Sequence, residues 1–211
     1  MKYKLLVFDL DGTLVDTRED LAAAVNEMRK HYQLPILPQK EVVSYVGDGA
    51  RKLVERSLKG ENIDTDQALK VMLSSYEENI CVFSKIYEGC LAFLNDMKNS
   101  DVQMAVLTNK PQSLTNIILE ELKLTQYFNP IFGPEGAACH KPEPGGLLQC
   151  VEINNCTSTE TLMIGDHHTD LRVAQNAGID KAFFTGGMGH DDEIVPEITF
   201  NSYQELANKL S

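Results

Sequence analysis

One stretch near the start of the chain decides the fold: Leu5-Leu6-Val7-Phe8-Asp9-Leu10-Asp11-Gly12-Thr13-Leu14. Four consecutive apolar residues are typical of a strand buried on both faces of a sheet. Side chains alternate along extended chain, so Asp9 and Asp11 are expected to point the same way. Two carboxylates a few ångströms apart repel each other by roughly 4 kcal/mol at an effective dielectric constant of 20. The pair therefore indicates a bound cation, a shared proton or a reaction that needs both groups.

The segment that follows, residues 16–83, is predicted to be helical throughout. Its apolar residues recur at three- and four-residue spacing, and prolines and glycines divide it into short helices. It contains no run that is typical of a strand. This segment is expected to form an inserted all-helical domain, with hinges near residues 13–17 and 82–88.

The rest of the chain alternates between strands and helices. Apolar runs predict strands at residues 102–107, 161–164 and 181–185, with helical spacing between them and a terminal helix over residues 202–210. Such alternation predicts an α/β fold with a Rossmann-like, doubly wound parallel sheet. The expected core domain comprises residues 1–15 and 84–211.

The composition excludes several classes of partner. The chain has 211 residues and a formal net charge of -12, which disfavours binding to the phosphates of a nucleic acid. No stretch approaches the roughly 20 apolar residues of a membrane span. The five cysteines are odd in number and lack a Cys-x-x-Cys pair, which favours a reducing compartment. We expect a cytoplasmic monomer or homodimer without membrane contact.

Polar residues follow three of the predicted strands. Asp9 ends the first strand, Thr108 ends the strand over residues 102–107, and Asp166 follows the strand over residues 161–164. Ligands of doubly wound sheets bind beyond the carboxyl ends of the strands, so these residues are expected to meet in one crevice. Each alone could simply cap the next helix. Their occurrence together, with a Lys-Pro at Lys141, is hard to obtain by chance.

These motifs, in this order, resemble those of the haloacid dehalogenase superfamily of aspartate-nucleophile phosphatases. The similarity covers nearly the whole chain, and the helical insertion lies where that superfamily has a mobile cap. The four matching motifs are Asp9-Leu10-Asp11-Gly12-Thr13-Leu14-Val15-Asp16, Leu107-Thr108-Asn109, Lys141, and Gly165-Asp166-His167-His168-Thr169-Asp170.

The resemblance implies catalytic and metal-binding roles for the acidic residues. Asp9 would attack phosphorus and form an aspartyl-phosphate, which divides one difficult step into two. Asp11 would protonate the leaving oxygen and then deprotonate the attacking water. Mg²⁺ would bind the Asp9 carboxylate, the backbone carbonyl of Asp11 and Asp166. Asp170 would support this metal site, directly or through water.

The resemblance also implies residues that contact the substrate. The Thr108 hydroxyl and backbone amides near Asn109 would hold the phosphoryl oxygens, and Lys141 would balance the charge of Asp9 and the phosphate. Gly12 would allow the backbone to approach the ligand closely. The His167-His168 pair departs from the usual fourth motif, and we expect exposed neighbours or a supporting role rather than metal ligands.

Two further strings resemble the phosphoglycolate phosphatase branch: Thr108-Asn109-Lys110-Pro111 and Val46-Gly47-Asp48-Gly49-Ala50-Arg51-Lys52-Leu53-Val54. A Gly-x-Gly turn that opens a helix offers free backbone amides to an anion such as a carboxylate, and Arg51 or Lys52 could add a charge. A plain loop with a solvated arginine explains the second string equally well. From the resemblance to this branch, we expect the substrate to be a small phosphorylated metabolite, with 2-phosphoglycolate as the leading candidate.

Other functions remain open at this point. Pyrophosphatases, sugar phosphatases and phosphosugar mutases have similar motifs, and a mutase would use both Asp9 and Asp11. A haloalkanoate dehalogenase would not need Asp11, because halide leaves without a proton. A non-catalytic binding protein on this fold would be expected to lack a reacting residue, and none is missing here.

Overall fold

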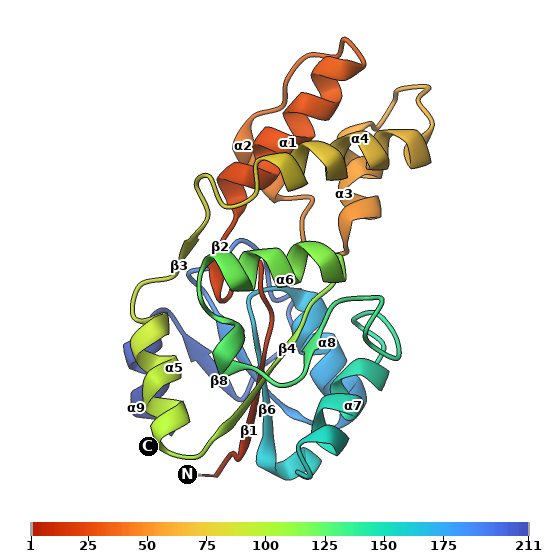
Figure 1. Ribbon diagram of the computed structural model, residues 1–211. Helices are drawn as coiled ribbons and strands as arrows, with labels where there is room; N and C mark the ends of the chain where they lie inside the picture. Colours follow the sequence, from red (N-terminus) through yellow and green to blue (C-terminus); the bar gives the residue numbers. More distant parts are fainter. Residues whose placement is uncertain (1, 211) are drawn as a thin grey trace.

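The computed structural model describes residues 2–210, and a parallel sheet forms its centre (Figure 1). The strand order is β5-β4-β1-β6-β7-β8, so the first strand lies in the middle and the chain winds outward in both directions. This confirms the doubly wound α/β fold predicted from the alternating pattern. The strands are β1 (Leu5–Phe8), β4 (Gln103–Leu107), β5 (Ile131–Phe132), β6 (Thr161–Gly165), β7 (Asp180–Phe184) and β8 (Ile198–Phe200).

Helices cover both faces of the sheet because β1 is apolar on both sides. Leu5 and Val7 pack on the face covered by α7 and α8, whereas Leu6 and Phe8 pack on the face covered by α5, α6 and α9. These four side chains are fully buried, as the unbroken apolar run predicted. The helices are α5 (Cys90–Asn99), α6 (Gln112–Glu121), α7 (Gly145–Ile153), α8 (His168–Ala177) and α9 (Tyr203–Leu210), with 3-10 turns at Thr125–Tyr127 and Ser158–Glu160.

The insertion, residues 17–84, contains helices and no strand, as predicted. Its core is an apolar interface in which Val25 and Met28 of α1 belong to the same buried cluster as Met72 and Tyr76 of α4. It lies over the carboxyl ends of the strands (Figure 1). The insertion helices are α1 (Arg18–His31), α2 (Gln39–Val43), α3 (Ala50–Ser57) and α4 (Thr65–Glu78).

Two strands that the sequence did not reveal connect the insertion to the core. Strand β2 (Val15–Asp16) pairs antiparallel with β3 (Lys85–Ile86), so both connections run side by side. The predicted domain boundaries, after residue 15 and before residue 84, fall in or beside this ribbon. We propose that it is the hinge of the insertion.

The described part of the chain, residues 2–210, contains no helix that is long and apolar enough to cross a membrane.

Candidate active site

A cavity lies between the carboxyl ends of the strands and the helical insertion. The core contributes polar groups to its wall, whereas the insertion contributes mainly apolar side chains. The lining residues from the core include Asp9, Asp11, Thr108, Asn109, Lys110 and Asp166. Those from the insertion include Val43, Val46, Gly47, Gly49, Ala50, Leu53, Met72, Leu73 and Tyr76. The structure therefore brings together the three strand-end residues that the sequence analysis placed in one crevice.

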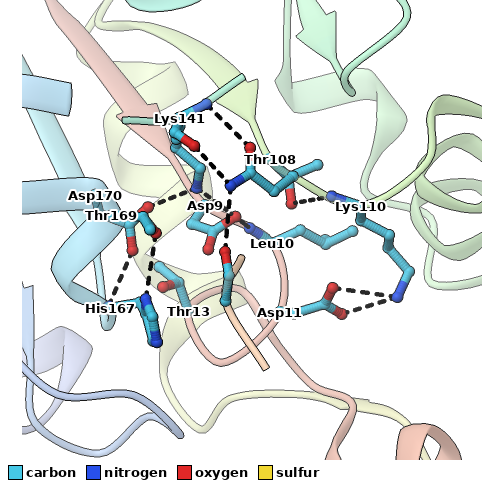
Figure 2. Close-up of polar contacts among 12 residues, drawn as sticks. Asp9, Leu10, Asp11, Thr13, Thr108, Lys110, Lys141, His167, Thr169 and Asp170 are labelled. Carbon is cyan, nitrogen blue, oxygen red and sulfur yellow. Dashed lines mark hydrogen bonds and ion pairs between the residues drawn. The ribbon is translucent and has the colours of Figure 1, made fainter. Parts of the chain in front are cut away.

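Asp9 is buried at the end of β1 and lies next to Lys141. Its carboxylate accepts a hydrogen bond from the backbone N–H of Leu10 at 2.7 Å, and Lys141 Nζ lies 3.0 Å from the same oxygen (Figure 2). Burial raises the pKa of Asp9 to about 6, although the charge of Lys141 opposes this shift. An Asp9 carboxylate that is fixed, desolvated and close to one cation has the features of an activated nucleophile.

Asp166 is a second buried carboxylate of the site, only 2% exposed. The Thr13 hydroxyl donates to one of its oxygens at 2.7 Å. The backbone amides of Met188 and Gly189 donate to the other at 2.7 and 3.0 Å. Burial, together with the negative charges of nearby acidic groups, raises the pKa of Asp166 to about 7. The cost of ionising this group would fall if a cation were bound beside it.

The residues of this cluster fit a magnesium ion. Carboxylate oxygens of Asp9, Asp166 and Asp170 lie within 4.8 Å of one another, and all three residues are buried. Mg²⁺ prefers such hard oxygen ligands, and its charge would offset the repulsion that raises the pKa values of Asp9 and Asp166. Asp170 already accepts hydrogen bonds from Lys141 Nζ at 2.5 Å and from the backbone N–H of His167 at 3.0 Å. These contacts suit a residue that supports the site and orients Lys141.

Gly12 packs closely against Asp166. It is absent from the cavity wall formed by residues 2–210, and its backbone lies against Asp166 instead. A Cβ atom on Gly12 would lie 2.3 Å from an Asp166 oxygen, and the φ of +83° also favours glycine. The structure therefore shows a close approach of Gly12 to the Asp166 carboxylate, and its approach to the substrate stays a prediction.

Lys141 is held in place by Asn109 and by two carboxylates. The Asn109 side chain accepts the backbone N–H of Lys141 at 3.0 Å and donates to its carbonyl at 3.1 Å. Burial alone would lower the pKa of Lys141, but Asp170 and Asp9 raise it above its usual value. Lys141 is thus a permanent cation beside Asp9. Asn109 also donates to the Gly47 carbonyl at 3.2 Å, so its side chain bonds both to Lys141 and to the insertion.

Asp11 has a cation partner of its own, which the sequence analysis missed. Lys110 Nζ lies 3.1 and 3.2 Å from the two oxygens of Asp11 (Figure 2). It also donates to the Tyr76 hydroxyl of α4 at 2.9 Å. The Thr17 hydroxyl donates to Asp11 at 2.7 Å. Strand β1 ends at Phe8, so the regular alternation that predicted a parallel carboxylate pair does not extend to Asp11. Asp9 and Asp11 line one cavity but each has its own lysine.

The sequence analysis included Lys110 only as part of Thr108-Asn109-Lys110-Pro111, and nothing in the sequence indicated that it would contact Asp11. Its side chain is 3% exposed, and burial alone would lower its pKa, but the charge of Asp11 raises the pKa above the usual value. Thr108 precedes it, and the Thr108 hydroxyl accepts the backbone N–H of Lys110 at 3.3 Å. Thr108, which is expected to bind the phosphate, and Lys110, which contacts Asp11 and Tyr76, therefore lie in the same loop after β4.

Two other expectations concern Arg51 and His167. Arg51 does not reach the cavity: its side chain is 52% exposed and forms an ion pair with Asp66 on the surface of the insertion. The helical phase of α3 turns Leu53 and Ala50 inward and Arg51 outward. His167 is buried, which excludes the exposed alternative and leaves the supporting role, and burial lowers its pKa to about 4.

The comparisons with known proteins agree with this geometry. A family described as haloacid dehalogenase-like hydrolase matches residues 6–184 of the chain. The chain belongs to the haloacid dehalogenase-like hydrolases. This confirms the resemblance that was inferred from the four motifs.

Relatives within this hydrolase family narrow the resemblance. The chain is 34% identical to phosphoglycolate phosphatase 1 of Pseudomonas aeruginosa over 92% of its own length and 74% of the relative's. It is 33% identical to the phosphoglycolate phosphatase of Colwellia psychrerythraea over 98% of its length and 96% of the relative's. A crystal structure of a predicted phosphoglycolate phosphatase from Haemophilus somnus superposes with a TM-score of 0.94 at 25% identity, covering 100% of this chain and 99% of that one. The resemblance to the phosphoglycolate phosphatase branch is thereby confirmed.

Proposed function

We propose that the protein is a Mg²⁺-dependent phosphatase that hydrolyses a small phosphorylated metabolite, with 2-phosphoglycolate as the preferred substrate. The observation that carries this proposal is the pairing of each candidate catalytic carboxylate with its own buried lysine, Asp9 with Lys141 and Asp11 with Lys110. The relatives named phosphoglycolate phosphatase support the choice of substrate.

The reaction proceeds in two steps, and Asp9 reacts in both. In the first, a carboxylate oxygen of Asp9 attacks phosphorus in line, and the bond from phosphorus to the alcohol oxygen breaks as Asp11 gives that oxygen a proton. In the second, Asp11 takes a proton from water, the water oxygen bonds to phosphorus, and the bond from phosphorus to Asp9 breaks. Inorganic phosphate leaves and both carboxyl groups return to their starting states.

Other residues of the site hold the phosphoryl group and balance its charge. Lys141 offsets the negative charge that accumulates on Asp9 and the phosphoryl oxygens, and Asp170 and Asn109 fix its position. The Thr108 hydroxyl and backbone amides near Asn109 would bind the phosphoryl oxygens. Asp9, Asp166 and the backbone carbonyl of Asp11 would hold Mg²⁺, which would supply positive charge beside the transferring phosphoryl group.

Asp11 needs a fixed position in order to transfer a proton, because the transfer requires hydrogen-bond distance to the leaving oxygen. Lys110 and the Thr17 hydroxyl hold the Asp11 carboxylate in place. Thr17 directly precedes α1, the first helix of the insertion. The contact of Lys110 with Tyr76 joins this group to α4. Lys110 therefore connects Asp11 to α4 of the insertion.

The wall formed by the insertion favours a small substrate. Tyr76 is the only side chain with a hydroxyl, amide or charge that the insertion contributes to the cavity wall in residues 2–210, and its hydroxyl already contacts Lys110. The hydroxyls of a sugar phosphate would be left without partners there, which costs about 1–3 kcal/mol for each buried group. The start of α3 faces the cavity at Gly49 and Ala50, has no side-chain cap, and offers backbone N–H groups to a carboxylate.

A panel of phosphate esters tests the substrate. We expect Mg²⁺-dependent release of inorganic phosphate, abolished by EDTA, with kcat/KM for 2-phosphoglycolate well above that for sugar phosphates and pyrophosphate. A flat profile would overturn the choice of substrate. Transfer of phosphate to a second hydroxyl, without release of inorganic phosphate, would indicate a mutase instead.

We further propose that the enzyme works in the cytoplasm as a monomer or homodimer. Cell fractionation tests the compartment, and light scattering on the purified protein tests the number of subunits; a secreted protein or a larger oligomer would contradict the proposal.

A further inference from the structure

Three histidines meet where the insertion contacts the core. His167 and His168 lie at the start of α8, and His190 lies in the loop between β7 and β8. One ring nitrogen of each lies within 4.8 Å of the others. The rings of His168 and His190 stack at 5.0 Å with an interplanar angle of 19°, and the His167 ring lies 4.2 Å from that of His168. This cluster is distinct from the carboxylate cluster of Asp9, Asp166 and Asp170.

The cluster leaves ligand capacity unused. The Nδ1 atom of His168 is buried and has no hydrogen-bond partner among residues 2–210. Buried polar atoms are normally satisfied, so an orphaned imidazole nitrogen calls for an explanation such as an ion. His167 Nδ1 lies 3.3 Å from the Thr169 hydroxyl oxygen. Three imidazoles close together without carboxylates between them are typical of a transition-metal site.

The insertion brings a fourth ligand group to this cluster. Asp48 lies in the turn that precedes α3, and one of its oxygens is 3.8 Å from His168 Nε2, the ring nitrogen other than the orphaned Nδ1. Its other oxygen accepts a hydrogen bond from Arg56 at 2.5 Å, and Arg56 also donates to the Tyr45 carbonyl at 2.9 Å. These bonds orient the carboxylate, as supporting residues do at metal sites. The turn itself packs tightly, since a Cβ atom on Gly47 would lie 2.3 Å from the His167 ring.

We propose that His167, His168, His190 and Asp48 bind a divalent transition-metal ion of the Zn²⁺ class, at a site separate from that of Mg²⁺. Tetrahedral zinc with bonds of 2.0–2.1 Å places its nitrogen ligands about 3.4 Å apart. Reaching this value from the observed spacing of up to 4.8 Å requires the stacked rings of His168 and His190 to rotate as the ion binds. Imidazole nitrogens select Zn²⁺, Co²⁺, Ni²⁺ or Cu²⁺, whereas Mg²⁺ selects the oxygen cluster.

The ion would tie the insertion to the core, because Asp48 belongs to the insertion and the three histidines belong to the core. His167 and Gly47, the residue before Asp48, line the cavity. Metal bonds that join the insertion to the core at this place slow substrate entry and product release. Zn²⁺ therefore inhibits turnover at saturating Mg²⁺, a consequence that rests on the proposed phosphatase function. The binding of the ion does not rest on that function.

Cobalt is the probe for binding, because four-coordinate Co²⁺ with nitrogen and oxygen ligands absorbs visible light. The metal-stripped full-length protein is titrated with Co²⁺ in excess Mg²⁺, and Zn²⁺ is then added to displace the cobalt. We expect one Co²⁺ per chain with a four-coordinate spectrum. His168→Ala and His190→Ala each weaken binding at least about tenfold, and Asp48→Asn weakens it less. His31→Ala, which alters an exposed histidine outside the cluster, is the matched control and leaves binding unchanged.

Three results would overturn the metal site: no cobalt spectrum, equal affinity in His190→Ala and the parent protein, or displacement of the cobalt by Mg²⁺. A second arm measures hydrolysis of an aryl phosphate with and without Zn²⁺. We expect inhibition in the parent and its loss in His190→Ala and in Asp48→Asn, with Zn²⁺-free activity retained in both. Inhibition that persists in His190→Ala would contradict the tie. If no phosphate ester is hydrolysed, the proposed function fails while the cobalt result still decides the site.

Discussion

Replacing Asp166 with asparagine tests whether the buried negative charge of the acidic cluster destabilises the folded protein when no cation is bound. Asparagine keeps the shape of the side chain, its oxygen can accept the amides of Met188 and Gly189, and its NH₂ group can donate to the Thr13 hydroxyl. The substitution therefore removes the charge with few other changes. We expect the metal-free variant to be more stable than the metal-free parent at neutral pH and above.

The magnitude follows from the pKa of Asp166, which burial raises from the usual 3.8 to about 7. Between these values the folded protein holds a proton that the unfolded chain has released, so the free energy of unfolding falls as pH rises. The full difference between these two pKa values corresponds to a loss of roughly 4 kcal/mol in the free energy of unfolding of the parent. Asp166→Asn does not have this loss, because asparagine does not ionise. Asp9, with a pKa of about 6, adds a contribution of the same sign in both proteins.

The assay is urea unfolding in EDTA at a series of pH values from 4.5 to 8. We expect the parent to lose about 3 kcal/mol of stability relative to Asp166→Asn across this range, because part of the full difference is already lost at pH 4.5, and Mg²⁺ to restore it in the parent alone. Asp180→Asn is the control, because the hydrogen bond with Lys2 lowers the pKa of Asp180 and reverses the sign. Parallel pH profiles of the parent and Asp166→Asn would refute the reasoning.

Three further predictions concern single residues. Lys110→Met removes the cation that positions Asp11. We expect kcat to fall by at least about tenfold and KM to change by a smaller factor. An unchanged kcat would contradict the proposed role of the Lys110–Asp11 pair. Gly12→Ala should weaken Mg²⁺ binding, measured by calorimetry, whereas Gly60→Ala, also at positive φ but with no atom within 4 Å, should not. Arg51→Ala should leave KM for 2-phosphoglycolate within about twofold, because charge on the exposed surface is screened by solvent.

The strands of the core could be predicted from the sequence because burial on both faces produces unbroken apolar runs. Leu5–Phe8 and Thr161–Gly165 are examples, and the polar residue at the end of each run pointed to the site. Strand β8 and the β2–β3 ribbon were missed. Each has only two or three residues, which is too short for a periodic pattern, and tertiary pairing alone defines it.

Contacts between distant residues were beyond the sequence analysis for a different reason. Lys110 meets Asp11 across 99 positions in the chain, and only the fold shows which lysine reaches which carboxylate. His190 joins the His167-His168 pair from a loop that carries no motif. Arg51 was expected at the cavity because of its charge, but the phase of α3 directs it to solvent. Residue type and order predicted the reacting groups, whereas orientation and pairing needed the structure.

The most direct test of the central claim is to look for a phosphoryl group on Asp9. In Asp11→Asn, an aryl phosphate still reacts in the first step, since its leaving group needs no proton, but hydrolysis of the intermediate lacks its base. Rapid acid quench with peptide mass spectrometry should find one phosphoryl group per chain on the peptide that contains Asp9, together with a matching burst of the aryl alcohol. Continued release of aryl alcohol with no phosphoryl group on Asp9 would contradict the account.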